Sequence, residues 1–171
     1  MVKKDLYKGL KFPEKLNNED IVVTPLLFLR SKNTMKVETP FYKYVQREGS
    51  IQNSGFSSKR FMIFDTAQLC FNTMKKEKYS IELRKQAEGC IITHQIIAIL
   101  LYLIPNIEDT NKRREYIKEF CDKYNKMKYI NNNNYITEYL NNYNVQGLEN
   151  LIKNNDILKI DKMLGRKFYE K

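Results

Sequence analysis

Cysteine and histidine are scarce in this sequence of 171 residues, which contains three cysteines and a single histidine. The cysteines, Cys70, Cys90 and Cys121, lie among apolar or aromatic residues and form no C-x-x-C pair. An odd number of such cysteines argues against a disulfide framework and against a structural zinc site. We therefore expect reduced, buried thiols in a reducing compartment, the cytoplasm or the nucleus, with no metal and no cofactor.

Tryptophan is absent and alanine occurs only three times, whereas there are 23 lysines, 18 asparagines and 17 isoleucines. The abundant residues have A/T-rich codons, and the alanine codons are G/C-rich. This bias indicates an A/T-rich genome, such as that of a virus, a phage, a low-GC bacterium or a protist. Part of the lysine content therefore reflects codon usage rather than a requirement for positive charge.

A long uninterrupted apolar segment is also absent. The most apolar run covers the 15 residues 90–104 and ends at Pro105, whereas a membrane-spanning helix needs roughly 20 apolar residues. We predict a helix over about residues 82–104 that is apolar on all sides because other helices surround it, rather than membrane insertion. The N-terminal stretch MVKKDLYKGLKFPEK lacks the apolar core of a secretory signal, so we do not expect secretion.

His94, with Thr93 and Gln95, interrupts this apolar run near its start. A lone histidine acts as a general base or a pH switch only beside a suitable carboxylate or nucleophile. The Arg-x4-6-His motif of some ribonucleases would require an arginine at 87–89, where the chain has Ala-Glu-Gly. We therefore interpret His94 as a hydrogen-bonded residue within or at the edge of the core.

The length fits a single domain over residues 1–171, divided near residue 79. Residues 1–79 show mixed patterns of short strands, short helices and loops, and residues 80–171 show helical periodicity. The predicted class is mainly α, a helical bundle around the apolar helix. The smaller N-terminal part is predicted to be mixed β or irregular, which leaves an α+β class open.

Two Thr-Pro pairs, at 24–25 and 39–40, fit the N-cap and first position of short helices, the second ending at Gly49. The β-branched and aromatic residues at 22–23 and 41–45 also fit edge strands. A strand is predicted at 60–64, followed by a helix capped by Asp65 or Thr66. The buried face of that helix would hold four residues at helical spacing, Ala67, Cys70, Phe71 and Met74.

In the second half, the alternating residues 79–83 fit a short strand or, preferably, the start of the apolar helix with Ser80 as its cap. Asp109 or Thr110 is predicted to cap a helix that runs to about Lys128. A further helix follows over about 135–143, and two short helices follow around 148–152 and 157–164. The breaks fall at asparagine-rich turns, at 131–134, 144 and 154–156.

Positive charge is the main indication of function. Thirty Lys and Arg residues against 20 Asp and Glu residues give a net charge of +10, which attracts nucleic acid, an acidic protein or an anionic membrane. The helix after Asp109 has seven cations and three acidic residues, an excess of four, and Tyr129 follows it. Cations beside aromatic rings suit phosphate contact with base stacking, and the alternative is a solvated face with Glu–Lys pairs.

The segment NSGFSSKR, residues 53–60, is a second candidate phosphate-binding element. It lacks the Lys-Ser/Thr ending of a P-loop, and the alternative is a basic connector. Together these patterns predict a small accessory protein that binds DNA or RNA without catalysis. The predicted binding residues are Lys59, Arg60, Lys112, Arg113, Arg114, Lys118, Lys123, Lys126 and Tyr129. Residues 112–114 precede the apolar stripe of their helix and are expected to be exposed.

Two other functions fit the sequence less directly. A protein-binding module, an inhibitor or an assembly factor, would use the same basic face to dock on an acidic partner. A metal-dependent nuclease of the PD-(D/E)xK type would use Asp65 after the predicted strand, with Glu82-Leu83-Arg84 as its second half. Arg84 stands where that pattern has lysine, so no catalytic residue is predicted.

Overall fold

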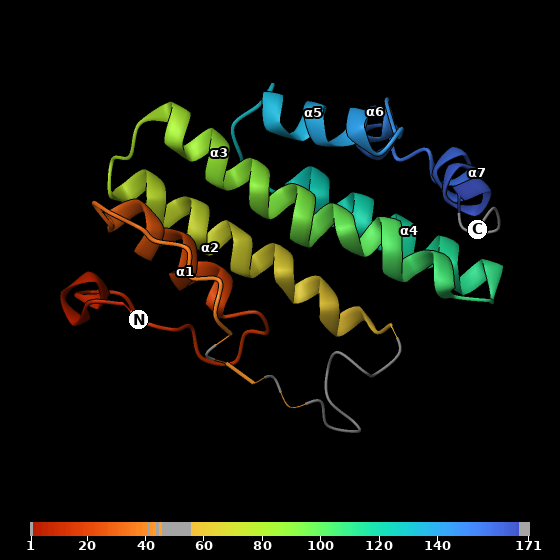
Figure 1. The fold of residues 1–171 in the computed structure, drawn as a ribbon. Coiled ribbons are helices and arrows are strands. Elements are labelled where there is room, and N and C mark those ends of the chain that lie inside the picture. Colours follow the sequence, from red (N-terminus) through yellow and green to blue (C-terminus); the bar gives the residue numbers. More distant parts are fainter. Residues whose placement is uncertain (1, 41, 44, 46–55, 168–171) are drawn as a thin grey trace.

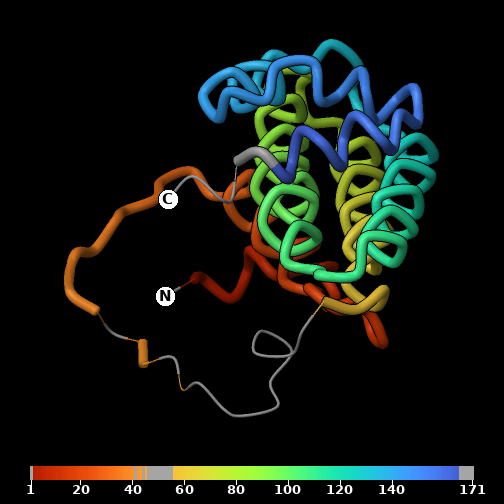
Figure 2. The backbone as a smooth tube through the Cα atoms, turned by 90° about the vertical axis from the view of Figure 1, so that its right-hand side faces the viewer, coloured from red at the N-terminus to blue at the C-terminus, as the bar shows by residue number. Residues whose placement is uncertain are grey.

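The computed structural model describes residues 2–40, 42, 43, 45 and 56–167, and within them helices are the only regular secondary structure. The predicted mainly-α fold is confirmed. Figure 1 shows α2, the apolar helix and α4 lying side by side, with α5 to α7 along one side of the bundle and the N-terminal part along the opposite side. Figure 2 shows the same order in a view nearly along the helix axes. In chain order the elements are η1 (Lys4–Tyr7), α1 (Asp20–Arg30), η2 (Ser58–Phe61), α2 (Met62–Lys76), α3 (Ile81–Ile91), η3 (Ile92–Ile97), η4 (Ile99–Leu103), η5 (Ile104–Asn106), α4 (Thr110–Lys126), α5 (Asn134–Asn142), α6 (Leu148–Lys153) and α7 (Ile157–Lys167).

The predicted apolar helix lies at the centre of the core. It begins as α3, where the Ser80 hydroxyl accepts a hydrogen bond from the Leu83 amide, and it continues through the π-helical segments η3 and η4 to η5 at Pro105. Five of its isoleucine and leucine side chains are fully buried: Ile92, Ile96, Ile97, Leu100 and Ile104. The helix is long and apolar enough to cross a membrane, and 61% of its most apolar window is buried within the bundle. That burial favours the core-helix interpretation.

Helix α1 lies parallel to α2. Near their starts, the Thr66 hydroxyl donates to the carbonyl of Asn17 at 3.0 Å. Near their ends, the Arg30 guanidinium forms an ion pair with Glu77. The two helices therefore begin and end together although 31 residues separate Arg30 from Met62 in the chain.

The predicted N-cap at Thr24 is wrong, because α1 begins at Asp20 and continues through Pro25. Val22 and Val23 are helical and buried rather than part of a strand. Packing of this apolar run explains the difference, since Pro25 removes only one backbone hydrogen bond from the helix. At the second Thr-Pro pair, residues 39 and 40 are not helical, and most of the helix or strand predicted there lies outside the described residues.

The predicted strand at 60–64 is also wrong. These residues form η2 and the first turn of α2, so Asp65 and Thr66 lie inside the helix and do not cap it. Phe61 and Phe64 are three positions apart and both face the core, which is helical spacing. The predicted face of α2 is confirmed, because Ala67, Cys70, Phe71 and Met74 are all buried.

The second half follows the sequence prediction closely. The Asp109 carboxylate caps α4 by accepting hydrogen bonds from the amides of Asn111 at 2.9 Å and Lys112 at 3.1 Å. Helix α4 ends at Lys126, two residues before the predicted end. Each asparagine-rich turn contains an asparagine with positive φ, and these are Asn132, Asn144 and Asn155 at 52°, 51° and 51°. Asparagine tolerates this left-handed conformation better than most residues do.

Candidate nucleic-acid interface

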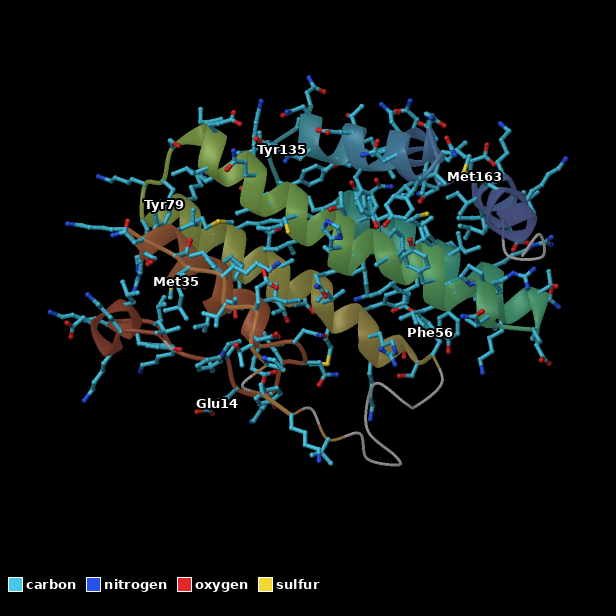
Figure 3. The ribbon with its side chains drawn as sticks, viewed as in Figure 1. Glu14, Met35, Phe56, Tyr79, Tyr135 and Met163 are labelled. Carbon is cyan, nitrogen blue, oxygen red and sulfur yellow. The ribbon has the colours of Figure 1, made fainter. Side chains whose placement is uncertain are left out.

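The structure brings together two of the predicted basic segments. Phe61 of η2 packs edge-on against Tyr116 of α4, with 6.3 Å between ring centroids, and Phe56 packs on the same tyrosine at 4.8 Å. These ring contacts hold Lys59 and Arg60 beside α4, more than 50 positions later in the chain. Figure 3 labels Phe56 at this end of the bundle.

On α4, Lys112 lies about one turn before Tyr116 and Lys123 about two turns after it, so all three share one side of the helix. Lys59 and Lys112 are exposed, and Arg60 and Lys123 are half-buried. We call the surface formed by Lys59, Arg60, Lys112, Tyr116 and Lys123 the η2–α4 surface. Within the described residues, Lys59, Lys112 and Lys123 form no ion pair. Glu119 lies on the same side of α4, so the surface is cationic without being free of acidic groups.

Arg113 and Arg114 serve a structural role that the sequence did not predict. The Nε of Arg113 donates to Asp161 Oδ1 at 2.6 Å, and the Nε of Arg114 donates to Oδ2 at 2.7 Å. Arg113 also donates to the carbonyl of Ile107 at 2.9 Å. These contacts fasten α7 to α4. Full exposure of residues 112–114 is therefore wrong for Arg113, which is half-buried.

Asp161 is buried between the two arginines, with 6% of its side chain exposed. Burial alone would raise the pKa of its carboxyl group, because a low-polarity environment disfavours the charged form. The hydrogen bonds and charges of Arg113 and Arg114 outweigh that effect and hold the pKa of Asp161 below its ordinary value. The carboxylate is therefore ionised at neutral pH and binds both arginines.

Lys118 lies on the other side of α4 from Tyr116. Its ammonium group pairs with Asp122 at 2.8 Å, one helical turn later, and this partner raises the pKa of Lys118. Lys118 also lines a hollow between α4 and the start of α7, together with Asn111, Arg114, Glu115 and Ile157. Lys126, at the last position of α4, is exposed. The predicted cations of α4 therefore point in several directions around the helix and do not form one face.

Tyr129 is not placed on the η2–α4 surface. Its hydroxyl donates to the Glu149 carboxylate of α6 at 2.7 Å, and its ring packs edge-on against Tyr124 at 5.7 Å. Burial raises the pKa of the Tyr129 hydroxyl, so the phenol stays protonated. Tyr129 therefore packs inside the protein, and the predicted arrangement of cations beside this tyrosine is not formed on the η2–α4 surface.

Glu88 is a second buried carboxylate that sequence reasoning missed. No part of its side chain is exposed; one carboxylate oxygen accepts from Arg84 at 3.0 Å and the other accepts from the Ile130 amide at 2.7 Å. Burial, and then the charge of Glu88, raise the pKa of Cys70 to about 12, so that thiol is inert. The four-residue spacing of Arg84 and Glu88 was the only indication in the sequence.

His94 is exposed at the edge of the core, and its ring meets Tyr139 edge-on with 5.0 Å between centroids. Among the described residues His94 packs on this aromatic ring, and it forms no ion pair with a carboxylate of the kind that orients a catalytic histidine. The predicted position at the core edge therefore agrees with the structure. The predicted hydrogen bond is not among those of the described residues.

The arrangement required by the nuclease alternative is absent from the described residues. Asp65 lies in the first turn of α2 rather than after a strand, and Glu82 lies in the first turn of α3, next to the opposite end of α2. An α-helix of 15 residues is about 20 Å long, so these carboxylates cannot share a metal ion. No group of three His, Cys, Asp or Glu side chains in the described part of the chain could hold a metal ion.

Comparison with protein-family models, with curated proteins and with solved structures finds no match for this chain.

Proposed function

We propose that the protein binds nucleic acid without hydrolysing it, and that the η2–α4 surface contacts the phosphate groups. One observation carries the proposal: the packing of Phe56 and Phe61 on Tyr116 brings the cations of two distant segments together. Cations placed by such packing neutralise phosphates and release the counterions around them. The net charge of +10 adds long-range attraction for a polyanion.

The contacts of the other predicted residues narrow the mode of binding. Arg113 and Arg114 are held by Asp161, and Tyr129 is held by Glu149. Phosphate contact is therefore favoured over base stacking, because stacking needs an aromatic face free to receive a base. We expect similar affinity for single-stranded and double-stranded nucleic acid, with little dependence on sequence.

A suitable test measures the affinity for fluorescently labelled oligonucleotides over a range of salt concentrations. The test variant replaces Lys59, Lys112 and Lys123 with glutamine, which lowers the net charge from +10 to +7. Loss of three phosphate contacts should reduce the slope of log affinity against log salt by about 2 to 3 units.

The matched control replaces Lys4, Lys32 and Lys76 with glutamine, which gives the same net charge at exposed sites away from η2 and α4. The proposal requires a much larger effect in the test variant than in the control. Equal effects in the two variants would show that binding depends on total charge and not on this surface. Failure of the parent protein to bind nucleic acid, with recovery of one defined acidic protein partner, would establish the protein-binding alternative.

A further inference from the structure

A second cationic surface surrounds the ion pair of Arg30 and Glu77, at the opposite end of α2 from η2. The Arg30 guanidinium pairs with Glu77 and also donates to the carbonyls of Leu6 and Lys8 at 2.9 and 2.8 Å. Glu77 accepts a further hydrogen bond from Tyr79. Figure 3 labels Tyr79 at this end of the bundle and Phe56 at the other. One ion pair therefore joins η1, the end of α1 and the end of α2.

The segments joined in this way are strongly basic. They contain seven exposed lysines, which we call the lysine pole: Lys3, Lys4, Lys8, Lys32, Lys75, Lys76 and Lys78. With Arg30 they give eight positive charges, against Asp5 and Glu77, so the excess is 8 − 2 = 6 of the total +10. None of the seven lysines forms an ion pair with another described residue.

Favourable interaction with the negative ends of helix dipoles explains the positions of only some of these lysines. Lys75 and Lys76 lie in the last turn of α2, where a cation interacts favourably with the helix dipole. Lys4 lies in the last turn of η1, and the other four lysines of the pole lie outside the last turns of η1, α1 and α2. Their concentration around one ion pair therefore has no explanation in the stability of the helices.

Exposed apolar side chains accompany the lysines. Ile81, three residues after Lys78, is 66% exposed, and Phe28, in the last turn of α1 but on the other side of that helix from Arg30, is 62% exposed. Tyr7 of η1 and Val2 are exposed on the N-terminal segment that Arg30 binds. Lysines interspersed with exposed aromatic and aliphatic side chains are typical of surfaces that adsorb to anionic lipid.

We propose that the lysine pole binds the surface of an anionic lipid bilayer, without any helix crossing it. The exposed aliphatic side chains favour a bilayer over a nucleic acid as the partner of this surface. Val2 and Ile81 have no flat face on which a base can stack, whereas they gain free energy by entering the boundary between lipid headgroups and acyl chains. The charge of the pole supplies the attraction to the headgroups.

The test is sedimentation of the full chain with phosphatidylcholine vesicles that contain or lack about 30% phosphatidylserine. The pole variant replaces Lys4, Lys32 and Lys76 with glutamine. A lysine near an anionic membrane contributes about fivefold to binding, so the variant should bind about a hundredfold more weakly. The variant with Lys59, Lys112 and Lys123 changed to glutamine has the same net charge and should bind vesicles like the parent.

The apolar contribution is tested by a second matched pair. Ile81→Ser should weaken vesicle binding about tenfold, and the loss should persist at high salt because it does not depend on charge. Leu158→Ser removes a side chain that is 63% exposed on α7, away from the pole, and should have no effect.

Three results would overturn the proposal: no vesicle binding at low salt, equal binding to vesicles without phosphatidylserine, or equal losses in the two lysine variants. Vesicle binding should be lost in the variant of Lys4, Lys32 and Lys76, whereas oligonucleotide binding should be lost in the variant of Lys59, Lys112 and Lys123. Failure of one proposal is therefore distinguishable from failure of the other.

Discussion

Replacing Gly89 with alanine is expected to destabilise the protein, although alanine is normally the better residue inside a helix. In an open helix the change stabilises by about 0.5 to 1 kcal/mol. At Gly89 in α3, however, a Cβ atom would lie 2.7 Å from the Cβ of Tyr135 and 3.1 Å from Oδ1 of Asn133. Figure 3 shows Tyr135 between α3 and α5.

Neither neighbour can move aside easily. The Cβ of Tyr135 is attached directly to the backbone of α5. The Asn133 side chain donates to the carbonyl of Lys85 at 2.9 Å and accepts from the Tyr135 amide at 3.1 Å. Overpacking of this kind costs about 1 to 3 kcal/mol. After the gain in helix propensity, the free energy of unfolding should fall by about 1 to 2 kcal/mol.

For a chain of 171 residues, this loss corresponds to a Tm lower by about 2 to 8 °C. Thermal unfolding followed by circular dichroism measures it, and urea unfolding gives the free energy directly. Gly165→Ala is the matched control, because in the described part of the structure nothing beyond its chain neighbours and the backbone of α7 lies within 4 Å of the Cβ it would add. That variant should be slightly more stable than the parent. If Gly89→Ala is as stable as the parent, the close approach of α3 and α5 is not as described.

Three further predictions concern the core and the buried ion pairs. Ile97→Asp should abolish cooperative thermal unfolding, because a buried unpaired charge costs several kcal/mol, and a normal melting curve would remove Ile97 from the core. Asp161→Ala should lower the free energy of unfolding in urea by about 1 to 3 kcal/mol, less than for a fully buried pair because both arginines keep some solvent contact; an unchanged midpoint would contradict the contact. Folding lowers the pKa values of Asp161 and Glu77 from 3.8 and 4.5, so these carboxylates should stabilise the folded protein fully above those values and lose that effect as the pH falls below them. When the free energy of unfolding is measured during acid titration, it should therefore fall less in Asp161→Ala than in the parent.

The helices of the second half were predictable because the information for each is local. Ser80 and Asp109 precede apolar residues at helical spacing, and both act as N-caps. Asparagines mark the ends of the helices, and three of them adopt the left-handed conformation. Spacing, cap and turn agree in this half, so one sequence is sufficient.

In the first half, local rules and tertiary packing disagree. A Thr-Pro pair is a good helix start, but Ile21 and Val22 precede Pro25 and are buried as part of the same helix. The run from Phe61 to Phe64 is too short for periodicity to separate a strand from a helix. The contacts that decide the outcome, such as Thr66 with Asn17, join residues far apart in the chain.

The η2–α4 surface was likewise only partly predictable, because contacts between distant residues determine its composition. The cations of α4 are visible in the sequence, but Asp161, the partner of Arg113 and Arg114, follows them by 48 and 47 positions. Tyr129 and Glu149 are 20 positions apart. Which cations hold the fold together and which remain available to a partner is decided by these distant contacts, and composition and periodicity carry no information about them.

The parallel arrangement of α1 and α2 has a consequence for the order in which the chain folds. The contacts at the two ends of this pair join residues 49 and 47 positions apart, whereas a turn of four residues connects α2 to α3. Closing a long loop costs more entropy than closing a short one, so local hairpins form earlier. Helix α1 should therefore dock after α2 and α3 have paired. In the native protein its amides should exchange with solvent sooner than those of the apolar helix, because the last element to dock is the first to open.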